Sequence, residues 1–168
     1  MSSLSSTMNL RHLKLLAFVI PIIVVTAAFA ATQVTFQNTS RINTGLNIFI
    51  TQPSNVSPGS CPAHLTAAYI NNPTSVFWNL TQGGAPQIEF FCIDNQGSTS
   101  DNPSVTSTLG PPGACPSTGN GLVFQAPTGV PVSLAANTAT TTPVSIGVCA
   151  GSNAVVQTTG PTFSVTVT

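Results

Sequence analysis

Residues 28–40 read AFAATQVTFQNTS, and this stretch organises the rest of the chain. Its first three residues place small side chains on both sides of a phenylalanine, which is typical of a signal-peptidase site at the end of an apolar run. Polar and apolar residues then alternate over residues 33–37, the pattern of a half-buried β-strand. Cleavage after Ala30 would therefore leave a chain whose extreme N-terminus is already a strand.

The first 30 residues have the parts of a Sec signal peptide. Arg11 and Lys14 form its basic region, and the apolar run over residues 15–29 forms its helical core. This run is short for a transmembrane helix, which needs about 20 residues. We expect residues 1–30 to be removed on export, with an uncleaved N-terminal anchor as the alternative.

Residues 31–168 are about the length of one domain and nearly uncharged. Their formal charges are those of Arg41, Glu89, Asp94 and Asp101. Disordered chains are usually charged and poor in β-branched residues, whereas this chain is rich in Val, Ile, Phe and Thr, so we expect a folded β-protein. Binding to nucleic acid needs clustered Lys and Arg and is not expected. Few titratable groups also predict a shallow dependence of stability on pH.

Short apolar segments separated by Gly, Pro, Asn and Ser recur along the chain after the first strand. This spacing predicts an all-β fold, a two-sheet Ig-like or Greek-key β-sandwich. We expect the signal peptide over residues 1–30, the N-terminal donor strand and linker over 31–40, and the sandwich over 41–168.

Several local elements follow from the same pattern. Within the sandwich we expect a polar turn at residues 38–45, a hairpin from 75–80 to 87–93, a surface loop over 94–120, and strands over 63–70 and 130–135. Three large side chains, Tyr69, Phe77 and Trp78, are expected to anchor the core.

All four cysteines follow the signal peptide, and an even number in an exported chain predicts two disulfides. Three pairings are possible. We favour Cys61 with Cys92 and Cys115 with Cys149, because each pair then joins a Cys-Pro loop to a strand cysteine in sequence order. A four-cysteine metal site would lack the C-x-x-C spacing.

The sequence holds few of the residue types that catalytic sites use. After the signal peptide the chain holds one histidine, His64, and three carboxylates, and no G-x-S-x-G surrounds a serine. Glu89 and Asp94 differ by an odd number, so an unbroken strand would direct them to opposite faces. A blue-copper site needs two histidines and a cysteine, whereas this part of the chain has a single histidine. Calcium binding near Asp94 or Asp101 stays open, with an ordinary Asx turn as the alternative. We expect no enzyme, cofactor or metal.

Three N-x-[ST] sequons begin at Asn38, Asn55 and Asn79. In an exported protein with few charges, N-linked glycans would supply the surface hydration that charges usually provide. We therefore expect glycans at these three asparagines.

The export signal, the immediate N-terminal strand at residues 32–37, the Thr- and Ser-rich β-sandwich, the sequons and the cysteines together resemble the thread filaments of thermoacidophilic archaea. More broadly, the layout is similar to archaeal surface filaments built by donor-strand complementation. In that family each subunit inserts its N-terminal strand into a groove of the next subunit, and the surface is heavily glycosylated.

The resemblance implies a structural, pilus-like subunit of a secreted cell-surface filament that supports adhesion or biofilm formation. Its partners would be further copies of itself, N-linked glycans, and other cells or surfaces. Val34 and Phe36 would be the buried side chains of the donor strand, with Thr35 and Gln37 facing outward. A first strand that pairs within its own chain is the alternative, and it implies a monomeric, glycosylated binding or adhesion domain. A virion component is a further alternative.

Overall fold

Eleven β-strands and no helix form the part of the chain that the computed structural model describes, residues 35–44, 47–71, 73, 75–155 and 163–168. The all-β expectation is therefore confirmed for these residues. Strands such as VFWNLT and VSIGVCA are rich in β-branched and aromatic side chains, which suit a pleated, half-buried surface. No helix with the length and apolar character to cross a membrane lies within the described ranges. The expected signal peptide lies outside them.

The strands form three sheets, and β1 with β11 is the one parallel pair among the described strands. The β1 sheet has the order β4-β1-β11-β7, with bounds Val76–Thr81, Thr35–Thr44, Phe163–Val167 and Val105–Ser107. The β10 sheet has the order β5-β10-β8, with bounds Gln87–Phe91, Val144–Ala150 and Leu122–Thr128. The β2 sheet has the order β3-β2-β6-β9, with bounds Tyr69–Ile70, Ile48–Thr51, Ile93–Asn95 and Thr138–Ala139.

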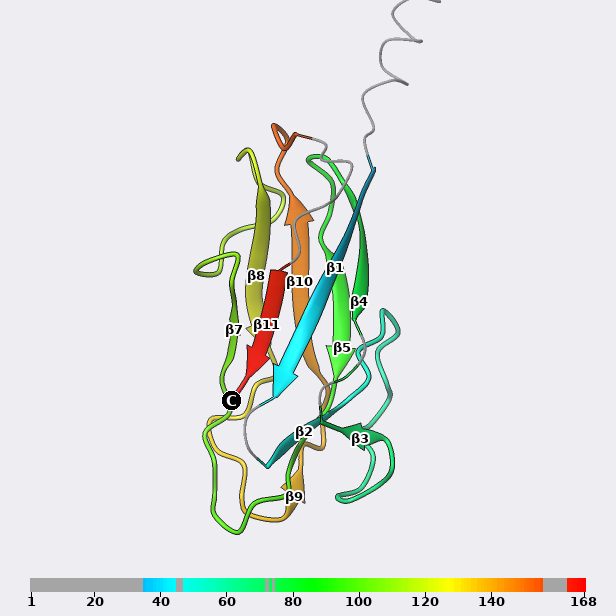
Figure 1. Ribbon diagram of the computed structural model, residues 1–168, viewed down its shortest axis with the longest axis vertical. Helices are drawn as coiled ribbons and strands as arrows, with labels where there is room; N and C mark the ends of the chain where they lie inside the picture. Colours follow the sequence, from blue (N-terminus) through cyan, green and yellow to red (C-terminus); the bar gives the residue numbers. More distant parts are fainter. Residues whose placement is uncertain (1–34, 45–46, 72, 74, 156–162) are drawn as a thin grey trace, which may run out of the picture. The chain divides into compact units, whose positions relative to one another are not determined.

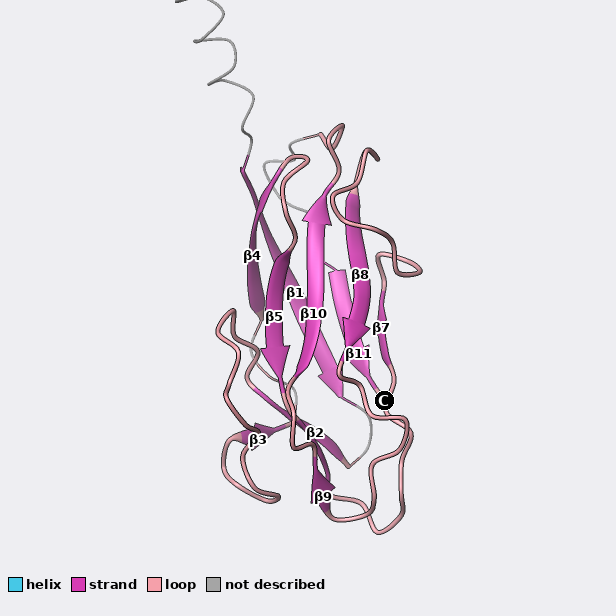
Figure 2. Cartoon of the chain, turned by 180° about the vertical axis from the view of Figure 1, so that it is seen from behind, coloured by secondary structure: helices cyan, strands magenta, loops and turns pink. Residues whose placement is uncertain are grey.

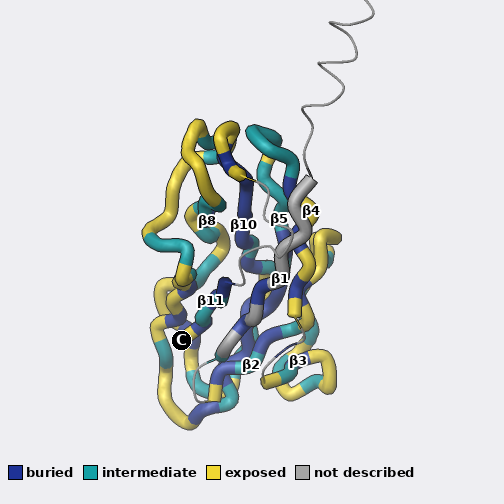
Figure 3. The backbone as a smooth tube through the Cα atoms, turned by 45° about the horizontal axis from the view of Figure 1, so that its top comes forward, coloured by how far each residue is buried: buried dark blue, intermediate teal, exposed yellow. Residues whose placement is uncertain are grey.

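The β1 sheet lies in front of the β10 sheet in Figure 1, and Figure 2 shows the β10 sheet from the opposite side. Buried positions alternate along β11, where Phe163, Val165 and Val167 are buried and Ser164 and Thr166 are partly exposed. This alternation is the one expected of a strand with one buried face. Figure 3 shows the buried backbone concentrated along β10 and β11, with exposed loops around them.

Two disulfides join Cys61 to Cys92 and Cys115 to Cys149, which confirms the favoured pairing. Their sequence separations are 31 and 34 residues. Loops of this length correspond to about 3–4 kcal/mol of stabilisation per disulfide in the chain-entropy description. Paired cysteines are typical of an oxidising compartment, as outside the cell.

The turn expected at residues 38–45 is wrong, because β1 continues as a strand to Thr44. Its first half pairs with β4 and its second half with β11. Asn, Ser and Thr favour turns when local hydrogen bonds decide the backbone. Here the two partner strands supply those bonds, and Ser40 and Ile42 are buried. β1 also runs across the domain boundary expected at residue 40.

The expected hairpin is wrong, because β4 and β5 belong to different sheets. The turn between them includes Gly83, which has a positive φ of 65° and donates its N–H to the carbonyl of Ala150 in β10. This bond anchors the connection to the second sheet. Local sequence marks where the chain turns, and it does not specify whether the next strand joins the same sheet.

Of the three expected anchors, Trp78 and Tyr69 are buried, whereas 70% of Phe77 is exposed. Successive strand residues face opposite sides, so the burial of Trp78 in β4 requires its neighbour Phe77 to face outward. An apolar side chain thus lies on the outer face of a strand that ends a sheet.

The remaining local expectations fail where a strand depends on distant partners. The surface loop expected over residues 94–120 contains the end of β6 and all of β7, and Asp94 and Asn95 are buried. No strand forms over 130–135, where Leu134 makes a single bridge to Asp101. Of residues 63–70, Tyr69 and Ile70 alone are in a strand. Such short elements have little periodicity of their own.

Candidate functional site

The N-terminal strand β1 lies inside its sheet, between strands that are distant in sequence (Figure 1). Residues 35–40 pair antiparallel with residues 76–81 of β4, and residues 40–44 pair parallel with residues 163–167 of β11. β1 therefore bridges a strand from the middle of the chain and the last strand. Without it, the sheet would separate into β4 and the pair β11–β7, leaving a slot with unpaired backbone groups on both sides.

The proposed donor residues have the following positions. Val34 lies outside the described residues. Phe36 lies opposite Leu80, whose side chain is buried, and Gln37 lies opposite Asn79, whose side chain is exposed. The donor role of Val34 and Phe36 stays a prediction.

The described side chains that hold β1 in place are Ser40 and Ile42, which are 1% exposed. The indole N–H of Trp78, a fully buried residue, donates a 2.8 Å hydrogen bond to Ser40 Oγ. The centroid of the Trp78 ring also lies 5.9 Å from the ring centroid of Phe163 in β11. Because a buried donor needs a partner, Ser40 fixes the register of β1. Neither Ser40 nor Ile42 was predicted from the sequence, because residues 37–41 are all polar and the alternation of residues 33–37 stops there.

Replacing Ser40 by Ala should lower the free energy of unfolding by about 1–3 kcal/mol, because it leaves the buried Trp78 N–H without an acceptor. In a Trp78→Phe background the same change should cost less, because the donor is gone. Denaturant unfolding of the four proteins in this cycle measures the difference. Ser145→Ala, which removes an exposed hydroxyl bond to Thr128, is the control. Additive effects of the two core changes would contradict this role for Ser40.

The outer edge of β4 is occupied by a side chain from the other sheet. The amide oxygen of Gln87 in β5 accepts from Asn79 N–H at 2.7 Å, and its nitrogen donates to the carbonyl of Phe77 at 3.2 Å. These are the backbone groups that a further strand would need. Strand addition to β4 at these residues therefore requires displacement of Gln87.

Buried Asp94 and partly exposed His64 form a pair that was not predicted from the sequence. His64 Nδ1 lies 2.6 Å from Asp94 Oδ1, and Asp94 Oδ2 accepts from Leu65 N–H and Gln96 Nε2 at 3.2 and 3.0 Å. The Cys61–Cys92 disulfide brings the two segments together, three and two residues away. No sequence motif indicates this contact, since the residues are 30 positions apart.

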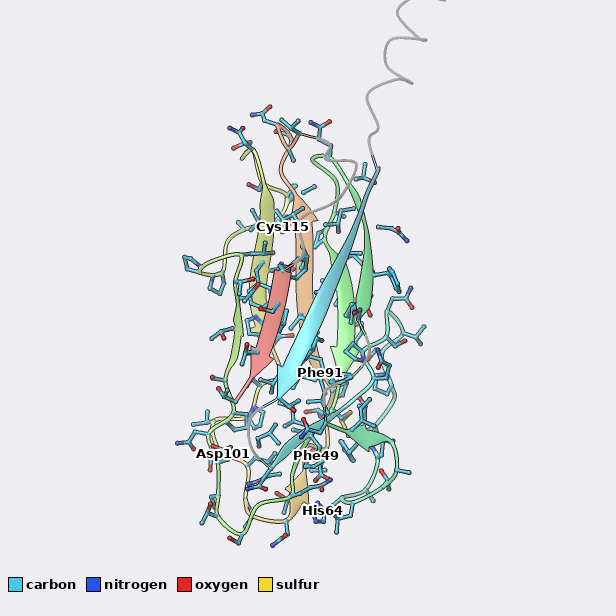
Figure 4. All side chains as sticks on the ribbon, viewed as in Figure 1. Phe49, His64, Phe91, Asp101 and Cys115 are labelled. Carbon is cyan, nitrogen blue, oxygen red and sulfur yellow. A yellow bond between two sulfur atoms is a disulfide. The ribbon has the colours of Figure 1, made fainter. Side chains whose placement is uncertain are left out.

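A histidine held by a buried carboxylate occurs in Ser-His-Asp hydrolases, where the second ring nitrogen contacts a nucleophile. Among the described residues, no hydroxyl hydrogen-bonds that nitrogen of His64. Figure 4 places His64 close to β9, on the loop that precedes β3. We interpret the His64–Asp94 contact as structural, because it holds this loop against β6.

Near the positions considered for calcium, side-chain oxygens accept hydrogen bonds from neighbouring backbone groups. Asn95 Oδ1 accepts from Gly97 N–H at 2.9 Å, and Asp101 Oδ1 accepts from Asn102 N–H at 2.8 Å. The first is an Asx turn, in which the side chain bonds the backbone N–H two residues on; the second is a contact with the next residue. Within the described ranges, no three His, Cys, Asp or Glu residues are grouped as metal ligands would be.

Glu89 in β5 is a buried carboxylate, 4% exposed. Desolvation raises the pKa of Glu89, and a 2.7 Å hydrogen bond from Gln87 Nε2 acts in the opposite direction. Burial, together with the nearby Asp94 charge, also raises the pKa of Tyr69 to about 12. The folded state therefore favours the ionised form of Glu89 less than the unfolded state does.

Stability should fall with rising pH through the range between the unfolded and folded pKa values of Glu89. In that range the folded protein binds more protons than the unfolded one, because its pKa is higher, and stability then decreases as pH increases. Glu89→Gln should remove this decrease and leave a protein that is more stable than the wild type at neutral pH. Denaturant unfolding from pH 3 to 8 tests this, with equal stabilities expected at the acidic end. An unchanged slope in the variant would contradict it.

The sequons differ in their surroundings. Asn55 lies in a loop and Asn79 on β4, and both are exposed. Asn38 lies in β1 opposite Trp78. Glycosylation at the three positions stays a prediction.

Comparison with known proteins found no match to this chain among family models, curated proteins or solved structures. The fold defines a class: an all-β protein with two disulfides and an N-terminal strand inserted into a sheet. Its function is therefore argued from this geometry.

Proposed function

We propose that the chain is the structural subunit of an extracellular filament, in which β1 of one subunit occupies the slot between β4 and β11 of the next. The observation that carries this proposal is the position of β1: it begins the described chain, yet it lies inside a sheet whose neighbouring strands come from elsewhere. In this proposal the β1 and β10 sheets are the two layers of an Ig-like sandwich that β1 completes.

The energetics of strand insertion favour such assembly. The slot presents buried side chains, Trp78 and Leu80 on one side and Val165 on the other. Each large apolar side chain buried by the inserted strand contributes about 1.5–3 kcal/mol. Backbone pairing with both neighbours adds specificity of register. The same contacts form whether the strand in the slot comes from the same chain or from another. The connection between β1 and β2 therefore decides which of these two arrangements forms.

The connection between β1 and β2 is short. Three residues separate Thr44 from Ile48, and the last of them, Asn47, has a positive φ of 64°. Four residue steps span at most about 14 Å, so a subunit that donates β1 must contact its acceptor directly. Because donor strand and acceptor slot are different surfaces, the contact is head-to-tail and extends as an open filament. Gln87 on the β4 edge disfavours lateral strand addition there.

The alternative is a monomeric, secreted and glycosylated binding domain. It is favoured by one observation: in the single chain, β1 fills its own slot. The two functions differ in whether the strand in the slot belongs to the same chain.

Cross-linking of β1 to β11 tests the proposal. Asn43 and Thr166 are register partners. All four native cysteines are in disulfides, so Asn43→Cys with Thr166→Cys adds the only free thiols. A short bismaleimide should link subunits of the native secreted material into a ladder on a denaturing gel. Conversion to an internally linked monomer would overturn the filament and support the alternative. Each single variant and Asn43→Cys with Thr142→Cys, an exposed position outside β11, are controls.

A further inference from the structure

Phe77 is an exposed aromatic residue two positions before a sequon. It lies on the outer face of β4, 70% exposed, while Trp78 on the inner face is fully buried. Asn79 lies on the same outer face, and Thr81 completes the sequon. Residues two apart in a strand are neighbours on one face. A group attached to Asn79 would therefore lie beside the Phe77 ring.

A shallow, mostly polar depression of about 440 Å³ adjoins these two residues. Its lining includes Phe77, Asn79, the loop residues Ser54 and Asn55, and the carboxylate residue Glu89. Gln87 fixes this arrangement, because its amide bonds both to the β4 backbone and to Glu89. Carboxylate and amide groups pair with hydroxyl groups, and an aromatic ring packs against C–H groups. The depression thus has the chemical groups of a saccharide-binding site, and we call it the saccharide seat.

We propose that the N-linked saccharide of Asn79 lies across Phe77 and fills this depression. The C–H face of its first sugar covers the Phe77 ring, and hydroxyl groups further along donate to the Glu89 carboxylate. In the linking step Asn79 Nδ2 loses a proton and bonds to the anomeric carbon of a saccharide diphosphate lipid. The bond from that carbon to the phosphate oxygen breaks, and the lipid diphosphate leaves. The inference rests on the exported location in the proposed function and is independent of filament assembly.

This seat accounts for two features of β4. The sugar removes from water an aromatic side chain that the pleat directs outward. It also covers the side of an edge strand whose backbone groups are held by Gln87. The saccharide would therefore shield β4 against lateral association.

The test uses the full chain secreted by a host with N-glycosylation. Peptide mass spectrometry should find the glycan on Asn79, and nuclear Overhauser effects should connect its first sugar to the Phe77 ring. Asn79→Gln should lower the midpoint of thermal unfolding by about 2–4 °C, and by less than half as much in a Phe77→Ala background. A Val132→Ala background is the control: Val132 is 92% exposed and lies outside the depression, so Asn79→Gln should cause its full shift there.

Three results would overturn the seat: an unmodified Asn79, equal effects of Asn79→Gln in both backgrounds, or ring contacts from the Asn55 glycan or an added free saccharide instead. A chain that shows the expected contacts but remains monomeric would support the seat and reject the filament. A cross-linked ladder without sugar contacts to Phe77 would support the filament and reject the seat.

Discussion

Removal of residues 35–44 should abolish filament assembly and leave a subunit that no longer unfolds cooperatively. The deletion removes Ser40 and Ile42 from the core and leaves the Trp78 N–H without its acceptor. It also leaves β4 and β11 without the strand that they share. The loss combines these two buried side chains with two rows of backbone hydrogen bonds, and a stability of about 5–15 kcal/mol does not survive it. Electron microscopy and denaturant unfolding of secreted material measure the two effects.

A peptide of residues 32–44 added in trans should restore the truncated subunit. Trp78 is the single tryptophan of the chain and is fully buried beside β1, so its fluorescence reports occupation of the slot. The emission should shift to the blue on binding. The same peptide with Ile42→Asp should fail, because it would bury an unpaired charge. A truncated chain that is stable and keeps Trp78 buried without peptide would show that β1 is dispensable.

Replacing Asp94 by Ala should lower the free energy of unfolding by about 1–3 kcal/mol, the usual cost of leaving hydrogen-bond donors without their acceptor. Asp94 is fully buried and accepts from the Leu65 N–H and the Gln96 side chain as well as contacting His64. Its loss leaves these groups unpaired and frees the loop between Cys61 and β3 from β6. Denaturant unfolding at neutral pH measures the change.

Asp101→Ala is the matched control for this prediction. Asp101 is partly exposed, and its carboxylate accepts one hydrogen bond, from the N–H of the next residue. We expect its replacement to cost less than about 1 kcal/mol. Equal losses in the two variants would show that the contacts around Asp94 do not support the fold.

The candidate site could be predicted from sequence only in part. Alternation along residues 33–37 places a strand at the N-terminus, because the period of side-chain direction is a local property. The end of that strand and its register were not predictable. They depend on β4 and β11, and on a hydrogen bond between Trp78 and Ser40 across 38 residues.

By itself, the sequence determined the all-β class and, from cysteine order, the two disulfides. Composition and cysteine parity are properties of the whole sequence, and the strand period is readable within a short window. Only the tertiary structure decided that β1 lies inside a sheet, that β4 and β5 part into different sheets, and that His64 meets Asp94. These contacts join residues far apart in the chain, and a strand's own residues specify its faces but not its neighbours.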